Sequence, residues 1–273
     1  MRGIAFYRKL TALVADFDNR ADALIVDLQS LVEKICRPDQ FCVDYTGTKD
    51  GLEEVLKRVP FCKAKLFATE VEQKELCIKP KVYNEGFKTS GQVQYVCRCG
   101  NYKEKGLPYH GALRVLKVMM GYEYLWINVR VKGGAYGCMT NYQKTGESYF
   151  VSYRDPNLKE TLDVYQKAAD FIRDFDADER TMTKYVIGAI SDKDVPLTPQ
   201  TKGNRSMSAY FADYDFAMEQ KERDELLATN PETIRSLAAY IDAFMEQDHI
   251  CVIGSEEKIK ENSGLFAHTE NLI

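Results

Sequence analysis

One short segment of this sequence could aim two hydrogen-bond donors at a single point. Residues 124–137 read Tyr-Leu-Trp-Ile-Asn-Val-Arg-Val-Lys-Gly-Gly-Ala-Tyr-Gly, so a predicted helix ends in cations, turns on two glycines and enters a predicted strand. Arg130 and Tyr136 flank this turn. A guanidinium and a phenol can both donate to a peptide carbonyl, or to the oxyanion that forms when that carbonyl is attacked. This segment is therefore a candidate catalytic and substrate-binding turn.

The same residues also have a purely structural interpretation. Arg130 and Lys132 can offset the helix macrodipole, because cations are favourable at a helix C-terminus. Gly133 can be the left-handed residue that ends the helix, and Tyr136 can be an ordinary strand aromatic. The physics of the segment alone favours this structural interpretation over the catalytic one.

Other kinds of catalytic site are not visible in the sequence. The three histidines, His110, His249 and His268, are not spaced with another histidine or a glutamate as zinc ligands are. There is no Gly-x-Ser-x-Gly motif, and no cysteine has a nearby histidine in the sequence to activate it. The glycine-rich residues 133–137 follow a helix instead of opening one, which disfavours nucleotide binding. A self-contained hydrolytic site is not predicted, and we expect no metal ligand in this chain.

Composition limits the classes of partner. The chain has 273 residues, with 37 basic and 41 acidic side chains and a net charge of −4. No basic run is interleaved with aromatics, so we do not expect nucleic acid as a partner. Hydrophobic residues at 45% and charged residues at 29% are typical of globular proteins. No apolar stretch approaches the roughly 18 residues of a transmembrane helix, and the N-terminus lacks the apolar core of a signal peptide.

The eight cysteines are scattered along the chain without any Cys-x-x-Cys pair, which excludes a zinc knuckle or a thioredoxin-type motif. Cys97 and Cys99 alternate with other residues in a predicted strand, so both point to one strand face. We interpret all eight as reduced and mostly buried thiols. Together with the absence of a signal peptide, this predicts an intracellular, cytoplasmic protein.

The first 50 residues resemble the tail of an earlier domain. Two amphipathic helices and one alternating strand are predicted there, followed by a short helix that opens at Thr48; the ranges are 4–16, 21–36 and 41–45. The remaining residues, 51–273, are predicted to form one α+β domain.

Period-two and period-3.6 patterns alternate through residues 51–273. A first hairpin is predicted from a strand through Val82 and a strand over 93–99, joined across 89–91, and a second from 138–142 and 149–153. A helix over 108–130, bent at Gly121, lies between them. The later helices are predicted at 158–172, 178–189, 204–213, 216–228 and 231–246, with irregular chain over 191–203 and a buried strand over 250–253. This order indicates an α+β fold with a mostly antiparallel or mixed sheet packed on helices.

The turn at 130–137 repeats an Arg-Val-x-Gly-Gly-Ala-Tyr-Gly motif, and with it the chain closely resembles the C-terminal half of the insulinase-like, or pitrilysin-type, zinc metallopeptidases. Within these inverzincins the resemblance is to the presequence-protease subfamily. It extends to residues 187–192 and to the prolines that follow them, to residues 3–7 and to residues 250–254. Practically the whole chain is covered.

The resemblance implies the metallopeptidase fold of the mitochondrial-processing-peptidase type, in which two homologous halves close as a clamshell. In that family the N-terminal half carries a His-x-x-Glu-His zinc motif and a later glutamate ligand, and this chain has no such motif. The resemblance therefore implies a zinc ion bound by an N-terminal half, with this chain inactive alone. It also implies unfolded peptides as substrates.

Two residues carry over from the family motif. Arg130 and Tyr136 match the arginine and tyrosine that reach across the closed chamber to the substrate and the tetrahedral intermediate. Gly133 and Gly134 would shape the turn that positions this pair at the substrate. The resemblance thus assigns catalytic and substrate-binding roles to the first pair and substrate-binding positions to the glycines.

Two alternatives stay open at this point. The chain could be a non-catalytic homologue that acts as a binding or structural subunit, although a scaffold would not need both Arg130 and Tyr136. It could also be an unrelated soluble binding domain whose motif matches are accidental. The presence or absence of an upstream zinc motif would separate the first alternative from a peptidase.

Overall fold

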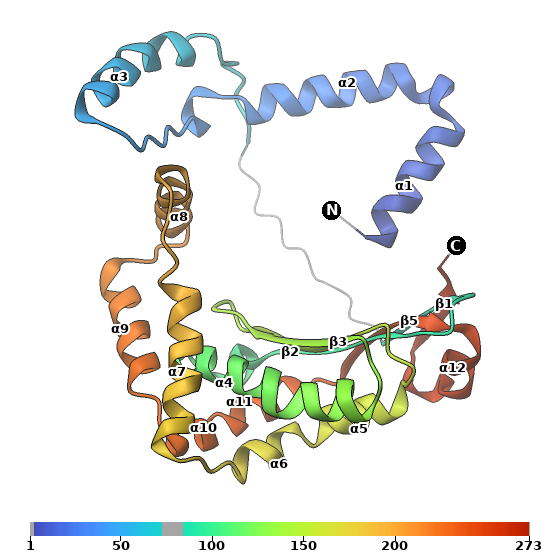
Figure 1. Ribbon diagram of the computed structural model, residues 1–273. Helices are drawn as coiled ribbons and strands as arrows, with labels where there is room; N and C mark the ends of the chain where they lie inside the picture. Colours follow the sequence, from blue (N-terminus) through green and yellow to red (C-terminus); the bar gives the residue numbers. More distant parts are fainter. Residues whose placement is uncertain (1–2, 73–83, 273) are drawn as a thin grey trace. The chain divides into compact units, whose positions relative to one another are not determined.

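The computed structural model describes residues 3–72 and 84–272. The chain separates into two compact units, shown in Figure 1. We call the first the helical unit; it comprises residues 1–79 and 197–213. The second, the sheet unit, comprises residues 80–196 and 214–273 and carries the candidate turn.

The described part of the helical unit is built from helices: α1 (Ile4–Ala15), α2 (Phe17–Ile35), η1 (Pro38–Gln40), α3 (Lys49–Lys63) and α8 (Pro199–Phe211). Thr48 caps α3 as predicted, since its hydroxyl accepts from the Gly51 amide at 3.2 Å. Residues 41–46 form no strand, contrary to the prediction. Alternating apolar residues make a strand only where a neighbouring strand is available to pair with them.

Helix α8 begins five residues earlier than predicted. The hydroxyl of Thr198 accepts from the Thr201 amide at 3.2 Å, and Pro199 occupies the first turn, where no backbone donor is required. A proline thus starts this helix within the stretch 191–203 that was predicted to be irregular. The first residues of that stretch are also helical, because α7 continues to Lys193.

The sheet unit contains a six-stranded mixed sheet with the order β3-β4-β2-β5-β1-β6. The strands are β1 (Glu85–Thr89), β2 (Tyr95–Asn101), β3 (Gly137–Tyr142), β4 (Glu147–Tyr153), β5 (His249–Ser255) and β6 (His268–Asn271). Strand β1 is parallel to β5 and β6, and the other pairs are antiparallel. The predicted mixed sheet and the predicted β3–β4 hairpin are confirmed.

The predicted first hairpin is wrong. Strand β5 lies between β1 and β2, parallel to the first and antiparallel to the second, so β1 and β2 are not neighbours. The hydroxyl of Thr89, in the predicted turn, donates instead to the Gly254 carbonyl of β5 at 3.1 Å. Turn residues show where the chain bends, but they do not show whether a distant strand lies between the two strands that the turn connects. The strand predicted through Val82 lies outside the described residues.

Helices of the sheet unit gather below the sheet in the view of Figure 1. Helix α4 (Ala112–Met119) continues as a π-helical segment, η3 (Met120–Lys132), which contains the predicted bend position Gly121. The other helical segments are η2 (Tyr102–Lys105), α5 (Lys159–Gln166), α6 (Ala168–Arg173), α7 (Glu179–Lys193), α9 (Phe216–Leu227), α10 (Pro231–Ser236), α11 (Ala238–Met245), α12 (Glu256–Glu261) and η4 (Ser263–Leu265). The predicted helices 158–172 and 231–246 are therefore each divided in two.

The core lies between the sheet and these helices. Phe150 of β4 is fully buried and contacts Phe244 of α11 and Tyr165 of α5, with ring centroids 5.2 and 5.4 Å apart. Along β4 and β5, buried residues alternate with more exposed ones. One face of the sheet is thus covered by helices, while the alternate residues, such as Tyr153, remain accessible in the sheet unit.

Candidate functional site

The glycine turn needs both of its glycines, for different reasons. Gly134 has a left-handed backbone with φ +80°, and its amide donates to the Arg130 carbonyl at 2.9 Å. Gly133 is right-handed, with φ −82°, so the left-handed residue is Gly134 and not Gly133 as the structural interpretation assumed. A Cβ at Gly133 would lie 2.6 Å from the Val129 carbonyl oxygen. The turn therefore needs a glycine at 134 for its left-handed backbone and a glycine at 133 because the Val129 carbonyl leaves no room for a Cβ.

Tyr136, directly before β3, presents its side chain to solvent. Its side chain is 65% exposed, and its amide donates to the Arg154 carbonyl at 3.3 Å. The ring packs edge-to-face on Tyr153 with centroids 5.5 Å apart, and Tyr153 packs in the same way on Tyr95. Within the described residues the Tyr136 hydroxyl has no hydrogen-bond partner. The packed ring and the free hydroxyl together place a donor at the surface.

Arg130 is held in one orientation by two contacts. Its Cζ lies 3.8 Å from the centroid of the Trp126 ring, and its Nε donates to the backbone carbonyl of Tyr136 at 2.9 Å. No acidic side chain of the described residues forms an ion pair with it. The structure thus brings the predicted pair together, although the bond joins the guanidinium to the backbone of Tyr136 and not to its phenol.

Both side chains border one open pocket of about 540 Å³. Its lining residues are Val93, Arg130, Val131, Gly134, Ala135, Tyr136 and Arg154. Three of the four residues predicted from the sequence are among them; Gly133 is not. The pocket wall is apolar apart from one phenol and two guanidinium groups, so it suits a ligand with both apolar and hydrogen-bond-accepting parts.

Arg154 lines the pocket but is not predicted from the sequence. Its backbone is left-handed, with φ +49°, which is uncommon for a residue other than glycine, and its Cζ lies 5.9 Å from the centroid of the Tyr136 ring. The only signal in the sequence is a cation that directly follows a predicted strand, before Asp155 and Pro156. That pattern is typical of many turns and does not show that the side chain reaches Tyr136.

Asp155, the neighbour of Arg154, does not contribute its charge to the pocket. Its carboxylate is fully buried and accepts from the Thr161 hydroxyl at 2.7 Å and from the Asn157 amide at 2.9 Å. Its backbone amide and carbonyl pair with those of Gln94 at 2.8 and 2.7 Å. Asp155 therefore anchors the loop after β4 through buried hydrogen bonds. The pocket lining contains two cationic side chains and no acidic one.

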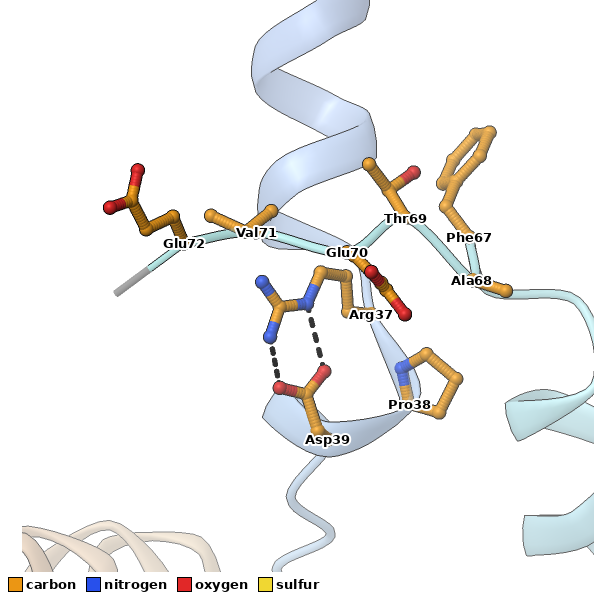
Figure 2. Close-up of a pocket in the computed structure, with 9 residues that line it drawn as sticks. All are labelled: Arg37, Pro38, Asp39, Phe67, Ala68, Thr69, Glu70, Val71 and Glu72. Atoms are coloured by element: carbon orange, nitrogen blue, oxygen red, sulfur yellow. Dashed lines mark hydrogen bonds and ion pairs between the residues drawn. The ribbon is translucent and has the colours of Figure 1, made fainter. Parts of the chain in front are cut away.

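A second pocket, of about 750 Å³, lies in the helical unit (Figure 2). It is formed by residues 37–39 and 67–72. Arg37 and Asp39 are joined there by two hydrogen bonds, one of them from Nε to Oδ1 at 2.9 Å. This pairing holds the pKa of the Asp39 carboxyl down, at about 2. The lining has no histidine or cysteine, so this pocket offers a neutralised ion pair and no nucleophile-base pair.

The structure also bears on metal and thiol chemistry. Over residues 3–72 and 84–272, no three or more His, Cys, Asp or Glu side chains are grouped so that they could hold a metal ion. In the same ranges no helix is both long and apolar enough to cross a membrane.

The prediction of mostly buried thiols is wrong for the seven cysteines that the structure describes, all of which are free. Cys36, Cys42 and Cys62 are exposed, and Cys97, Cys99, Cys138 and Cys251 are half-buried.

Comparison with known proteins connects this chain to a peptidase family. Residues 84–256 match the PreP C-terminal domain. Protein HypA of Clostridium perfringens (strain 13 / Type A) is 38% identical over 271 residues, which cover 99% of this chain and 28% of that protein. Presequence protease 1, chloroplastic/mitochondrial, of Arabidopsis thaliana is 34% identical over 188 residues, which cover 67% of this chain and 17% of that protein. The chain thus spans less than a third of the length of either relative.

Among solved structures, the crystal structure of pitrilysin superposes with a TM-score of 0.51 at 9% sequence identity. The superposition covers 76% of this chain and 23% of pitrilysin. At this identity the likeness concerns the fold, which is the mixed sheet with its helices.

Proposed function

The chain belongs to the PreP C-terminal domain family, within the pitrilysin-type metallopeptidases, and from this membership we propose that it is the substrate-enclosing C-terminal part of a zinc metalloendopeptidase. In this proposal the complete enzyme hydrolyses unfolded oligopeptides. The observation that supports the proposal is that Arg130 and Tyr136 both line one pocket.

The two donors have different roles in the proposal. The Tyr136 hydroxyl is exposed and donates to the scissile carbonyl or to the oxyanion formed from it. Arg130 uses Nε to hold the Tyr136 carbonyl and its flat face to hold the Trp126 ring. Its other guanidinium donors are directed to the substrate. Because Arg130 is restrained, little side-chain freedom is lost when it binds.

We assign the zinc ion to an N-terminal half and propose no ligand from this chain. The described residues contain no cluster of three or more His, Cys, Asp or Glu side chains that could hold a metal ion, and the sequence lacks His-x-x-Glu-His. The partner of this chain is therefore a zinc-bearing half of the same enzyme, and the peptide is enclosed between the two. The chain alone is expected to have no peptidase activity.

The test is reconstitution of the chain with the N-terminal zinc-bearing part and measurement of kcat/KM on an unfolded, fluorescence-quenched peptide. Arg130→Ala and Tyr136→Phe are each expected to lower kcat/KM by roughly 10²- to 10³-fold, the usual loss for one oxyanion donor. Zinc content is expected to stay unchanged. Tyr122→Phe is the matched control, since Tyr122 is 68% exposed and does not line the pocket.

Unchanged rates in both variants would refute the assigned roles. A reconstituted complex that binds peptides but cleaves none would favour the alternative function, a non-catalytic homologue that serves as a binding or structural subunit.

A further inference from the structure

The pocket beside Tyr136 carries two positive charges without a counter-charge. Arg130 and Arg154 are the charged residues of its lining, and neither forms an ion pair with any described residue. The nearest acid in the sequence, Asp155, is fully buried and hydrogen-bonded to Thr161. A pocket lined by charge of one sign attracts ligands of the opposite sign. The pocket therefore favours an anionic group on whatever it binds.

The two guanidinium groups are connected through one residue. Arg130 donates to the Tyr136 carbonyl, and the Arg154 Cζ lies 5.9 Å from the centroid of the Tyr136 ring. A planar guanidinium matches a carboxylate with two parallel hydrogen bonds, which are stronger than bonds between neutral groups. The apolar side chains of Val93, Val131 and Ala135 complete the wall. This combination fits a carboxylate carried by a peptide better than a small inorganic anion.

We propose that Arg154, together with Arg130, forms a carboxylate-binding subsite that selects peptides with an acidic side chain or a free C-terminus next to the bond held at Tyr136. The inference rests on the proposed function for the identity of the ligand as a peptide. It goes beyond that function because it assigns Arg154 a role in specificity and gives the chain a charge preference of its own.

The chain contains its own reporter for a binding test. Trp126 is the single tryptophan of the sequence, and it stacks on Arg130 at the pocket. Its fluorescence can therefore follow peptide binding to the chain alone, without zinc or cleavage, and calorimetry checks the same titrations. Three peptides of otherwise equal sequence serve as probes: one with glutamate and an amidated C-terminus, one with glutamine and a free C-terminus, and one with glutamine and an amidated C-terminus.

We expect one or both carboxylate peptides to bind roughly tenfold more tightly than the neutral peptide, as one charge-assisted pair allows. Whichever carboxylate peptide binds more tightly than the neutral one shows whether the subsite binds an acidic side chain or a free C-terminus. The preference should weaken as salt is raised. Inorganic phosphate should compete only weakly.

Arg154→Gly is the decisive variant. Glycine adopts a φ of +49° more easily than arginine, so this variant should be at least as stable as the parent. It should lose the preference for carboxylate while it keeps its affinity for the neutral peptide. Arg154→Lys should keep part of the preference, because lysine retains the positive charge but cannot form two parallel hydrogen bonds with a carboxylate. The control is Arg180→Gln, an exposed cation of α7 that does not line the pocket.

Equal affinity for all three peptides, no binding of any of them, or a preference that survives Arg154→Gly would each overturn the proposal. These outcomes are separate from the reconstitution test. A carboxylate preference in a chain whose reconstituted complex never cleaves would leave the subsite standing and refute the peptidase function. Cleavage by the reconstituted complex, combined with equal binding of all three peptides, would support the peptidase function and refute the subsite.

Discussion

The side-chain amide of Asn157 donates from Nδ2 to the backbone carbonyl of Gly133 at 2.6 Å. This bond ties the loop after β4 to the turn that carries Arg130 and Tyr136. The same loop contributes Arg154 to the pocket and is fixed from inside by Asp155. The geometry of the candidate site therefore depends on a residue that lies outside both the pocket lining and the family motif.

Asn157→Ala tests this positioning role. Loss of the bond is expected to lower the free energy of unfolding by about 1 kcal/mol, and to slow turnover of the reconstituted enzyme while zinc content is unchanged. Asn262→Ala is the matched control, since Asn262 makes the same kind of bond, to the Lys258 carbonyl at 2.9 Å, away from the pocket. Urea denaturation and peptide cleavage are the measurements. Equal losses of turnover in both variants would show that stability, and not position, is responsible.

Gly134→Ala is expected to destabilise the sheet unit by about 1 kcal/mol, because its φ of +80° is unfavourable for a residue with a Cβ. Gly121→Ala makes a matched comparison in η3. A Cβ there would meet nothing within 4 Å, so this variant is expected to be neutral or more stable. Urea denaturation measures both. If Gly134→Ala is as stable as the parent, the left-handed turn is not required.

Glu222 of α9 forms ion pairs and hydrogen bonds with several side chains of the sheet unit. It is 3% exposed, and it accepts from Lys144 Nζ at 2.5 Å and from the Tyr214 hydroxyl at 2.6 Å, with Arg114 as a further partner. Burial alone would raise the pKa of its carboxyl, but these hydrogen bonds outweigh burial and hold the pKa at about 2. Lys144 lies between β3 and β4, so Glu222 holds the hairpin that follows Tyr136.

This lowered pKa predicts an acid-sensitive fold. The pKa of the Glu222 carboxyl is 4.5 in the unfolded chain and about 2 in the folded chain. The contribution of Glu222 to stability is therefore complete above the unfolded pKa and is lost as the pH falls toward about 2. Glu222→Gln should lower the free energy of unfolding by roughly 3 kcal/mol at neutral pH, and should flatten the pH dependence in this window.

Urea denaturation at several pH values checks this prediction, with exposed Glu104→Gln as the control. A Glu222→Gln variant that keeps the full acid sensitivity of the parent would show that other carboxyl groups are responsible.

Cys99 is expected to be the most reactive of the half-buried thiols. The neighbouring Cys97 thiol lowers the pKa of the Cys99 thiol below its ordinary value, while burial raises the pKa of Cys138 to about 11. Because the thiolate is the nucleophile, alkylation of Cys99 should rise at a lower pH than alkylation of Cys138. Labelling rates by peptide mass mapping test this. Cys97→Ser should move the Cys99 profile; an unmoved profile would contradict the assignment.

Local features of this protein follow from its sequence because they depend on residues that are neighbours in the chain. Thr48 and Asp178 cap their helices where the sequence predicts helix starts. The β3–β4 hairpin forms around Gly146, whose φ of +102° suits glycine. The motif from Arg130 to Gly137 is likewise continuous in the chain, and it is enough to indicate the family and the candidate pair.

Only the tertiary structure decided how distant segments meet. It placed β5 between β1 and β2, brought Arg154 to the ring of Tyr136, and joined Asn157 to Gly133. It also paired Lys144 with Glu222. A periodic pattern determines which face of an element is buried, but each face is compatible with many neighbours. The neighbour is selected by packing and charge over the whole sheet unit, and no local pattern in the chain records that selection.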